Sequence, residues 1–366
     1  MARTTVLVMV DGLDPKYLDS CPAPNFGELA KKGFQTEVRA MMPTVTNVNN
    51  TSLVTNSYPE SHGITSNYWL DRESGSEHYM ESGEYIQAET MFQRATRQGA
   101  RSLLISSKDK LRRLLGDGAT VAFSSEEPDS RVVDAIGQPP PVYSLEVNGW
   151  IVDAARHVLA QESYDLVYLT TTDYAMHTYA PEQPESSDHL ALLDRAIGLL
   201  MESLPDGEIL ITADHGMSSK SRMIHLPAEL DRHGIRARAV PIIKDQYTVH
   251  HSNLGGCIYL YLDERDRERA LGILNNLDGV DQALDREAAA HRFRLMGSRI
   301  GDIMVLGAAD VVFGDPAEVT MPGGLRSHGS LYEEMVPVIG CGGDFDGFDF
   351  LENKDLGRYV FERVLP

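Results

Sequence analysis

Short apolar runs alternate with longer amphipathic stretches along most of this sequence, and this rhythm constrains the fold more than any other feature. Runs at 4–10, 165–171 and 208–213 have the length and residue types of buried parallel strands. Amphipathic stretches at 150–161 and 189–204 precede the last two runs. Strands and helices in this order predict a doubly wound α/β fold, with a mostly parallel central sheet and helices on both faces. The other helix-like and strand-like blocks lie at 25–33, 87–98, 102–106, 336–340 and 355–365.

One region, 223–325, interrupts this alternation. It contains strand-like GGCIYLYL at 255–262, helix-like ERDRERALGILNNL at 264–277 and strand-like RIGDIMVLG at 299–307. We interpret the region as a smaller α+β cap inserted into the core. The segment 108–145, rich in charge, Gly and Pro, is a candidate second part of this cap. The core is then predicted in three parts, at 1–107, 146–222 and 326–366.

Composition narrows the classes of function. Of 366 residues, 42% are hydrophobic and 24% are charged, and the formal net charge is −21. An acidic chain is unsuited to non-specific nucleic-acid binding, which needs a basic surface. No apolar run is long enough to span a bilayer, the first residues do not form a signal peptide, and three scattered cysteines give no disulfide framework. We therefore expect a cytoplasmic protein without nucleic-acid or membrane partners, and the sequence leaves a homodimer open.

Three of the predicted strands each end in an aspartate, namely Asp11, Asp173 and Asp214. Ligands of open α/β sheets bind at the carboxyl ends of the strands, so these carboxylates are expected to converge. A single Asp in such a place is most simply a helix N-cap or turn residue. Two of the three, however, have histidines at ligand spacing, with His177 four residues after Asp173 and His215 directly after Asp214. Mixed carboxylate and imidazole ligands suit zinc, and less selectively manganese or iron.

A catalytic metal site of this kind needs another ligand and a nucleophile. His328, in the Gly-flanked stretch LRSHGSL, is the candidate ligand, although by itself it would be interpreted as an ordinary loop histidine. Candidate nucleophiles lie in MPTVTNVNN, where Thr44, Thr46 and Asn47 could each simply cap the amphipathic helix predicted there. The N-terminus of a helix also favours a phosphate-like anion. A hydroxyl at that place becomes a good nucleophile once a base or a metal generates its alkoxide.

The combined set of motifs resembles the nucleotide pyrophosphatase/phosphodiesterase branch of the alkaline phosphatase superfamily. The set comprises Asp11, PTVTN at 43–47, DYAMH at 173–177, ADHGM at 213–217 and His328. It occurs in the order of that family and extends from one end of the chain to the other. The resemblance implies an alkaline phosphatase-like core, two Zn²⁺ ions and Thr46 as nucleophile. It assigns one zinc to Asp173, His177 and His328, and the other to Asp11, Thr46, Asp214 and His215.

Within this branch, further stretches resemble the phosphonoacetate hydrolase family. They are NVNNTSLVTNSYPESHGITSNYW at 47–69, SSKDKLRRLLG at 106–116, VHHSNLGG at 249–256, RIGDIMVLG and LRSHGSL. The resemblance implies that Asn67 binds a phosphonate oxygen, that Lys108 and Lys110 hold the substrate carboxylate, and that His250 contacts the substrate from the cap. Without the resemblance, a Lys-x-Lys pair is usually solvated. Its alternation would place both ammonium groups on one side of a strand.

The reaction implied is hydrolysis of the C–P bond of phosphonoacetate, giving acetate and phosphate through a phospho-threonine at Thr46. In this scheme one zinc generates the attacking alkoxide and the other polarises the leaving group. Two alternatives stay open. The first is a phosphodiesterase, nucleotide pyrophosphatase or other phosphorus ester hydrolase on the same scaffold. Aromatic side chains in the cap that can stack a nucleoside would favour it. The second is a non-catalytic metal-binding protein, against which the intact nucleophile and ligand set argue.

Overall fold

The largest sheet confirms the predicted fold class. The computed structural model describes residues 3–365, and within this range the sheet has seven strands in the order β2-β17-β8-β1-β7-β5-β6. The strands from β8 to β6 pair in parallel, whereas β17 runs antiparallel to both β8 and β2. The bounds are β1 (Thr5–Met9), β2 (Phe34–Arg39), β5 (Ser102–Ser106), β6 (Val121–Ser124), β7 (Leu166–Thr170), β8 (Glu208–Thr212) and β17 (Met335–Cys341).

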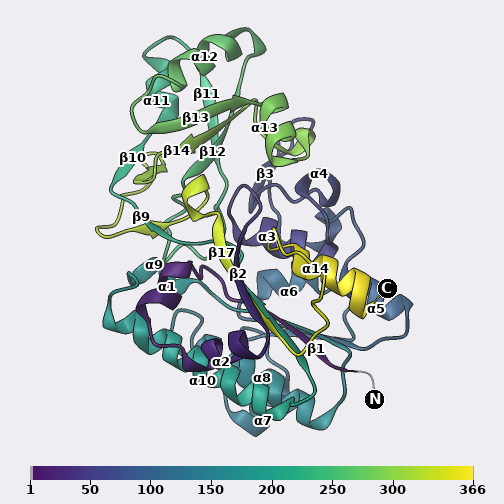
Figure 1. Ribbon diagram of the computed structural model, residues 1–366. Coiled ribbons are helices and arrows are strands. Elements are labelled where there is room, and N and C mark those ends of the chain that lie inside the picture. Colours follow the sequence, from purple (N-terminus) through teal and green to yellow (C-terminus); the bar gives the residue numbers. More distant parts are fainter. Residues whose placement is uncertain (1–2, 366) are drawn as a thin grey trace.

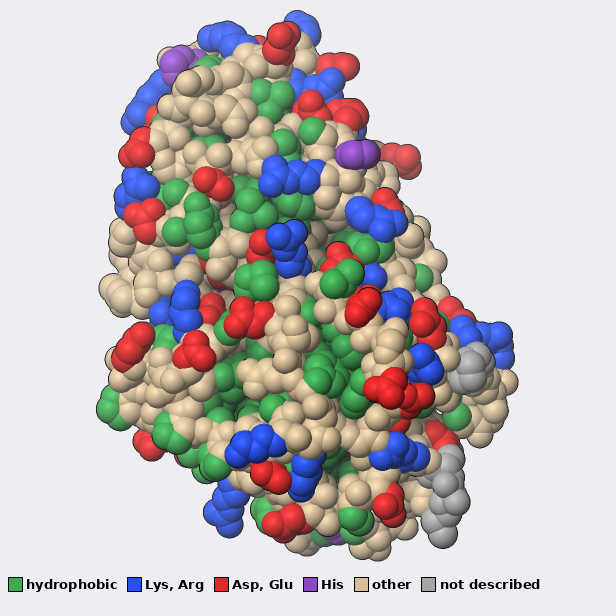
Figure 2. All heavy atoms as spheres, in the orientation of Figure 1, with side chains coloured by type: hydrophobic (Ala, Val, Ile, Leu, Met, Phe, Trp, Pro, Cys, Tyr) green, Lys and Arg blue, Asp and Glu red, His purple; other side chains and the backbone are tan. Residues whose placement is uncertain are grey.

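Helices cover both faces of the main sheet, with one group on each side (Figure 1). One group contains α1 (Pro15–Ser20), α2 (Pro24–Lys32), α7 (Ser130–Ile136), α8 (Val147–Gln161) and α10 (Pro184–Ser203). The other contains α3 (Thr46–Thr55), α5 (Met91–Arg97), α6 (Asp109–Leu115) and α14 (Asp355–Tyr359). Every residue of β1, β5, β7 and β8 is buried, because helices exclude water from both faces. Acidic and basic side chains are interspersed on the face shown in Figure 2, so the negative net charge does not form one patch there.

The cap region has its own antiparallel sheet, in the order β11-β12-β14-β13, and lies at the top of Figure 1. Its elements are α11 (Leu226–Asp231), β11 (Ala237–Pro241), β12 (Cys257–Leu262), α12 (Arg267–Leu274), β13 (Val280–Asp285), α13 (Arg286–Phe293) and β14 (Ile303–Gly307). Leu230, Leu260 and Ile303 belong to a hydrophobic cluster separate from the core under the main sheet. An α+β body with its own core therefore sits on the larger domain, as the sequence predicts.

Short elements connect the two bodies or complete the core. The strands are β3 (Tyr68–Leu70), β4 (Glu77–Tyr79), β9 (Ser218–Ser219), β10 (Arg222–Ile224), β15 (Val311–Phe313) and β16 (Arg326–Ser327). The helical ones are α4 (Pro59–His62), η1 (Gly83–Tyr85), α9 (Tyr174–Thr178), η2 (Glu264–Asp266), η3 (Gly297–Arg299), η4 (Leu331–Glu333) and η5 (Val360–Val364). Within residues 3–365, no helix combines the length and the apolar character required to cross a bilayer. The cellular location and a homodimer stay predictions.

The segment 108–145 differs from its prediction. It contributes β6 to the edge of the main sheet, where β6 pairs in parallel with β5, so this strand belongs to the core and not to the cap. The predicted strand-like alternation of Lys108 and Lys110 is also wrong. Lys108 is the N-cap of α6 and Lys110 lies inside that helix, because Asp109–Leu115 buries Leu111, Leu114 and Leu115 at helical spacing.

The helix that carries the candidate nucleophile is buried along its whole length. Its polar side chains are accommodated by hydrogen bonds, as buried polar groups require. The Asn49 side chain bonds to both the N–H and the carbonyl of Met41, and Tyr168 donates to Asn50 Oδ1 at 2.7 Å. These bonds fix α3 to the chain before it and to β7, which holds its N-terminus in one place.

His62, at the end of α4, joins α4 to α3. Its Nδ1 accepts the Ile64 N–H at 3.1 Å, so its proton is on Nε2, which donates to Ser52 Oγ at 2.8 Å. Burial, together with the nearby Arg299 charge, lowers the pKa of His62 to about 3. The folded protein therefore keeps this imidazole neutral.

This depressed pKa predicts a pH-dependent contribution to stability. The contribution is fully present above the unfolded-state pKa of about 6.5 and is lost as the pH falls from there toward 3, because only the unfolded chain takes up the proton. Between pH 7 and pH 5, we expect wild type to lose about 2 kcal/mol more unfolding free energy than His62→Gln, measured by urea unfolding. His233→Gln, at an exposed cap position, is the control and should follow wild type. Parallel curves for wild type and His62→Gln would contradict this explanation.

Candidate metal centre

The aspartates that follow β1, β7 and β8 lie close together, because these three strands are neighbours in register. Met9 is the partner of both Thr170 and Thr212, so the three strands end at one level. His215 Nε2 is 3.5 Å from Asp11 Oδ1 and 3.6 Å from Asp214 Oδ2. His177 Nε2 is 2.9 Å from Asp173 Oδ2, since both residues project from the turn into α9. The structure thus gathers the carboxylates and both Asp-linked histidines at one edge of the sheet.

Three overlapping groups of buried donor atoms occur at this edge in the described chain. In each group the donor atoms lie within 4.8 Å of one another. The groups are Asp11, Asp214 and His215; Asp173, His177 and His250; and Asp173, His215 and His328. Every predicted ligand except Thr46 belongs to at least one of them, and Asp173 and His215 each belong to two. His250, expected only as a substrate contact, joins one group, with its Nε2 at 3.3 Å from Asp173 Oδ1.

Hydrogen bonds from the other ring nitrogen orient three of the histidines. Nδ1 of His177 lies 2.6 Å from the Arg326 carbonyl, Nδ1 of His215 lies 3.0 Å from the Gly216 carbonyl, and Nδ1 of His328 lies 2.7 Å from the Thr44 carbonyl. A carbonyl only accepts, so each Nδ1 carries the proton and each Nε2 keeps its lone pair. This is the arrangement that metal-binding histidines use.

Several of the atoms in the cluster that could bind a metal ion lack hydrogen-bond partners among the described residues. They are both carboxylate oxygens of Asp11, Oδ2 of Asp214, Nε2 of His177 and His215, and both ring nitrogens of His250. Buried polar atoms without partners are rare and costly in folded proteins. Lone pairs of carboxylate and imidazole, all facing one space, are the donor set that a divalent cation such as zinc satisfies. The residues present therefore fit the predicted metal ions.

Burial and neighbouring charges shift the pKa values of the three carboxylates in different directions. Burial, followed by the charges of Asp173 and Asp214, raises the pKa of Asp11 well above its ordinary value. Burial raises the pKa of Asp214 to about 6. Burial also acts to raise the pKa of Asp173, but Lys108 and the neighbouring histidines outweigh it and hold that pKa well below its ordinary value. A bound cation reverses the local preference for protonation and stabilises all three as carboxylates.

Thr44, Thr46 and Asn47, from the stretch with the candidate nucleophiles, have different places in the structure. The N-cap of α3 is Val45, so Thr46 is the first helical residue and does not cap the helix. The Thr44 hydroxyl donates to the Ser330 carbonyl at 2.9 Å and accepts the Gly329 N–H at 3.0 Å, which are structural contacts. Asn47 donates from its side chain to the Met80 carbonyl at 2.7 Å. Asn67 Oδ1 accepts the Asn47 N–H at 3.3 Å, which places Asn67 beside the N-terminus of this helix.

The two predicted lysines both lie near the Tyr247 ring, despite their unexpected helical setting. Lys108 Nζ is 3.0 Å from Asp173 Oδ1 and 3.7 Å from Asp11 Oδ2. Lys110 Nζ forms an ion pair with Asp245. The two ammonium groups are 5.6 and 5.3 Å from the centre of the Tyr247 ring. Lys108 is therefore tied to the carboxylate cluster and Lys110 to the cap, with one aromatic ring near both.

Asp245 and Tyr247 are residues of this site that sequence reasoning missed, and His251 is one to which it assigned no role. The Tyr247 hydroxyl donates to Glu126, and His251 Nε2 is 3.3 Å from Asp245 Oδ1. His251 Nδ1 accepts the Asn253 N–H at 2.9 Å, so His251 has the opposite tautomer from His177. The stretch VHHSNLGG drew attention to His250, but nothing in the sequence pairs Asp245 with a lysine 135 positions earlier.

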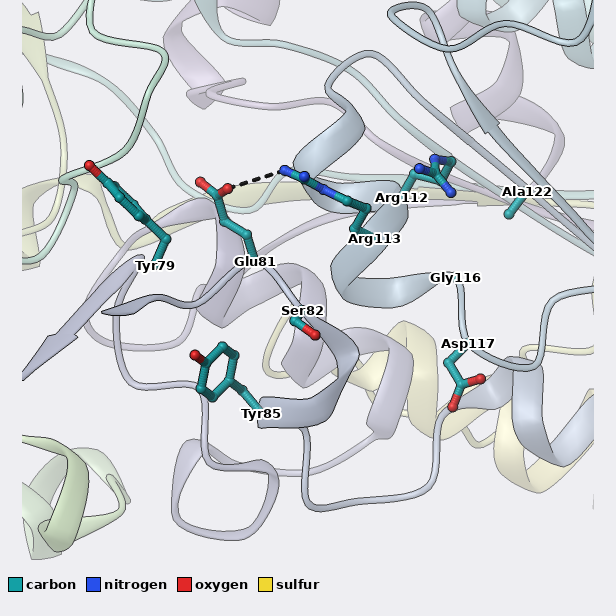
Figure 3. A pocket seen from close by; sticks show the side chains of 9 residues that line it. All are labelled: Tyr79, Glu81, Ser82, Tyr85, Arg112, Arg113, Gly116, Asp117 and Ala122. Atoms are coloured by element: carbon teal, nitrogen blue, oxygen red, sulfur yellow. Dashed lines mark hydrogen bonds and ion pairs between the residues drawn. The ribbon is translucent and has the colours of Figure 1, made fainter. Parts of the chain in front are cut away.

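A separate surface pocket of about 610 Å³ lies beside α6 (Figure 3). None of the predicted site residues lines it. Arg113, on its wall, pairs with Glu81 at 3.3 Å and with Asp109 at 3.5 Å. The charge of Arg113 thus has protein partners. The pocket is separate from the buried cluster of carboxylates and histidines.

Comparisons with known proteins identify related sequences and related solved structures. The family model for type I phosphodiesterase/nucleotide pyrophosphatase matches residues 5–331. The solved structure of phosphonoacetate hydrolase from Sinorhizobium meliloti 1021, in complex with phosphonoacetate, superposes with a TM-score of 0.90 at 32% identity. The match covers 99% of this chain and 96% of that one. Murine ectonucleotide pyrophosphatase/phosphodiesterase 5 in complex with AMP has a TM-score of 0.74 at 19% identity over 99% of this chain and 95% of that one, which shows a common fold.

Curated relatives match over a shorter part of their length. A venom phosphodiesterase of Naja atra is 26% identical over 232 residues, covering 59% of this chain and 26% of that protein. Bis(5'-adenosyl)-triphosphatase enpp4 of Xenopus laevis is 26% identical over 234 residues, covering 60% of this chain and 49% of that protein. The matched part thus spans between about a quarter and a half of these relatives. With the family model matching most of its length, the chain belongs to the type I phosphodiesterase/nucleotide pyrophosphatase family of hydrolases, in the alkaline phosphatase superfamily.

Proposed function

We propose that this protein is a zinc-dependent phosphonate hydrolase that cleaves the C–P bond of phosphonoacetate, giving acetate and phosphate. The observation that carries the proposal is the pair of buried lysines, Lys108 and Lys110, next to the donor cluster. A cation site for the phosphonate group and two ammonium groups for a carboxylate match the two charged ends of such a substrate. The likeness to phosphonoacetate hydrolase over nearly the whole chain supports the same substrate class.

The proposed ligands divide into two sets of donors. Asp11, Thr46, Asp214 and His215 would hold one zinc ion, and Asp173, His177 and His328 the other. When bound, such a pair of ions supplies Lewis-acid activation of the attacking and leaving groups. The Nδ1 bonds to backbone carbonyls keep His177, His215 and His328 in the tautomer that presents Nε2. His328, the third ligand of the second set, comes from the last core segment. Thr44 holds that segment beside α3.

Thr46 and the lysines would carry the chemical steps. The Thr46 hydroxyl gives its proton to solvent and its oxygen attacks phosphorus in line. A new O–P bond forms, and the C–P bond breaks with its electron pair on carbon. The carboxylate delocalises that charge as an enolate, which Lys108 and Lys110 stabilise before the carbon takes a proton from water. Water then attacks the phospho-threonine, releasing phosphate and restoring Thr46.

The phosphonate oxygens would be bound by the N-terminus of α3 and by Asn67. The helix is ten residues long, and its first N–H groups and dipole favour an anion. Asn67 accepts the Asn47 N–H through Oδ1, so its Nδ2 is the end that donates to the substrate. His250, next to Asp173 and on the cap side of the cluster, is proposed as a further substrate contact.

A second candidate, hydrolysis of a nucleotide pyrophosphate or phosphodiester, is favoured by one cluster of rings. The ring of Tyr143 lies 5.7 Å from that of Tyr174 and 5.5 Å from that of His250. Aromatic side chains beside a phosphoryl site can stack a base. A carboxylated substrate gains nothing from such rings, so activity toward phosphonoacetate compared with nucleotide esters separates the two candidates.

We expect Thr46→Ala to lower turnover by about four orders of magnitude or more, as loss of a nucleophile typically does. Folding and at least one bound zinc should be retained, because the hydroxyl is one of four donors in its set. Thr46→Ser, which keeps a hydroxyl, should retain measurable activity. The measurements are steady-state rates and metal content of the purified variants. Near-normal turnover by Thr46→Ala would show that water attacks phosphorus directly.

The lysine variants test the substrate class. We expect Lys110→Ala to lower kcat/KM for phosphonoacetate roughly 30- to 4,000-fold. This corresponds to a loss of about 2–5 kcal/mol of transition-state stabilisation. Hydrolysis of a nitrophenyl phosphodiester, which has no carboxylate, should be nearly unaffected. Lys108→Ala should impair both substrates, because this lysine also neutralises Asp173 and Asp11.

The matched control for both lysine variants is Lys31→Ala, which removes an exposed ammonium from α2. It should leave both activities at the wild-type level. An equal loss on the two substrates in Lys110→Ala would mean that this lysine serves the phosphoryl group or the fold. The assignment to phosphonoacetate would then lose its main support.

A further inference from the structure

Lys110 is a buried ammonium with a buried counter-charge supplied by the cap. Only 1% of Lys110 is exposed, and its Nζ pairs with a carboxylate oxygen of Asp245, which is 4% exposed. Removing a charge from water is costly unless an opposite charge and further hydrogen bonds compensate. Lys110 belongs to the core helix α6, whereas Asp245 lies between β11 and β12 of the cap. The buried ammonium of Lys110 is therefore paired with a carboxylate from the other body.

Asp245 is itself held by its own loop. Its Oδ1 accepts the Tyr247 N–H at 2.7 Å and lies 3.3 Å from His251 Nε2. Its backbone N–H donates to Asn253 Oδ1 at 3.2 Å. Ser252 and Asn253, which follow His251 directly, both have positive φ angles. These contacts hold the Asp245 carboxylate in place. They thereby also hold the Lys110 ammonium that it binds.

The two lysines differ in what holds them. Lys108 forms ion pairs with Asp173 and Asp11, which are proposed metal ligands. Among the described residues, Asp245 is the one carboxylate that pairs with Lys110. An ammonium has three N–H donors. Asp245 accepts one of them, which leaves two for a substrate. The Lys110–Asp245 pair has no net charge, so it adds little long-range attraction for a phosphorus ester that cannot reach it.

We propose that Asp245 is a positioning residue that gives the site its selectivity for carboxylate-bearing phosphonates, by fixing the ammonium of Lys110 beside Tyr247. The proposal rests on the proposed function, since it takes Lys110 as a ligand of the substrate carboxylate. Selectivity then depends on the cap loop, and the metal cluster acts on the phosphonate group whether or not a carboxylate is present. Replacing Asp245 should therefore change the preference among ligands and leave the affinity for a simple phosphonate unchanged.

The test compares two ligands that differ in the carboxylate. Dissociation constants for phosphonoformate and methylphosphonate are measured by titration calorimetry on zinc-loaded wild type, Asp245→Asn and Asp245→Glu. We expect wild type to bind phosphonoformate at least about tenfold more tightly than methylphosphonate, and Asp245→Asn to reduce this ratio to within about threefold. Its affinity for methylphosphonate should be unchanged. Asp245→Glu, which keeps the charge, should restore part of the ratio.

Two further variants separate positioning from a general structural role. Lys110→Ala combined with Asp245→Asn should bind phosphonoformate no more weakly than Lys110→Ala alone, because Asp245 acts through Lys110. Asp231→Asn, at an exposed cap position, is the matched control and should behave as wild type. Equal weakening of both ligands in Asp245→Asn, an unchanged ratio, or no preference in wild type would each overturn the proposal.

Turnover of phosphonoacetate is measured separately in wild type. If the ligand preference is present and depends on Asp245 but phosphonoacetate is not hydrolysed, C–P cleavage is refuted while the role of Asp245 stands. If phosphonoacetate is hydrolysed and the ratio is the same in Asp245→Asn, the proposed function stands and the role of Asp245 is refuted. The two failures therefore have different signatures.

Discussion

The concentration of buried negative charge at the ends of β1, β7 and β8 is the constraint on which the rest of the structure depends. Asp11, Asp173 and Asp214 are all buried, and the side-chain oxygens of Asp11 have no hydrogen-bond partner among the described residues. Such an arrangement is unfavourable in a protein that lacks compensating cations. Lys108 supplies one positive charge, and the proposed divalent ions would supply the remainder.

The parts around the cluster serve to hold its ligands in place. Arg326 donates to the carbonyls of Met176 and Met217, at 2.9 and 3.0 Å, and its own carbonyl orients His177. Residues far apart in the sequence thus hold each other around one site. Thr44 does the same for the segment that carries His328, through both its hydroxyl and its carbonyl. The orientations of His177 and His328 therefore depend on backbone carbonyls, which can only accept hydrogen bonds.

The sequence predicted those features that depend on local patterns. β5 has the expected bounds, and the aspartates after β1, β7 and β8 were found because apolar strands precede them. The setting of Lys108 and Lys110 was predicted wrongly, because a Lys-x-Lys pair suits a strand as well as the first turn of a helix, and the burial of Leu111 and Leu115 decides in favour of the helix. Asp245 could not be predicted, because its partner is distant in sequence and only the fold of the cap brings the two together.

The most direct test of the two-ion centre is to locate the metal ions. Crystals of the zinc-loaded protein give anomalous difference maps from data collected above and below the zinc absorption edge. We expect two peaks, about 4 Å apart, that are present above the edge and absent below it. One should lie against Asp11, Asp214 and His215, and the other against Asp173, His177 and His328. A single peak, or none, in crystals of protein that is fully active would contradict the two-ion centre.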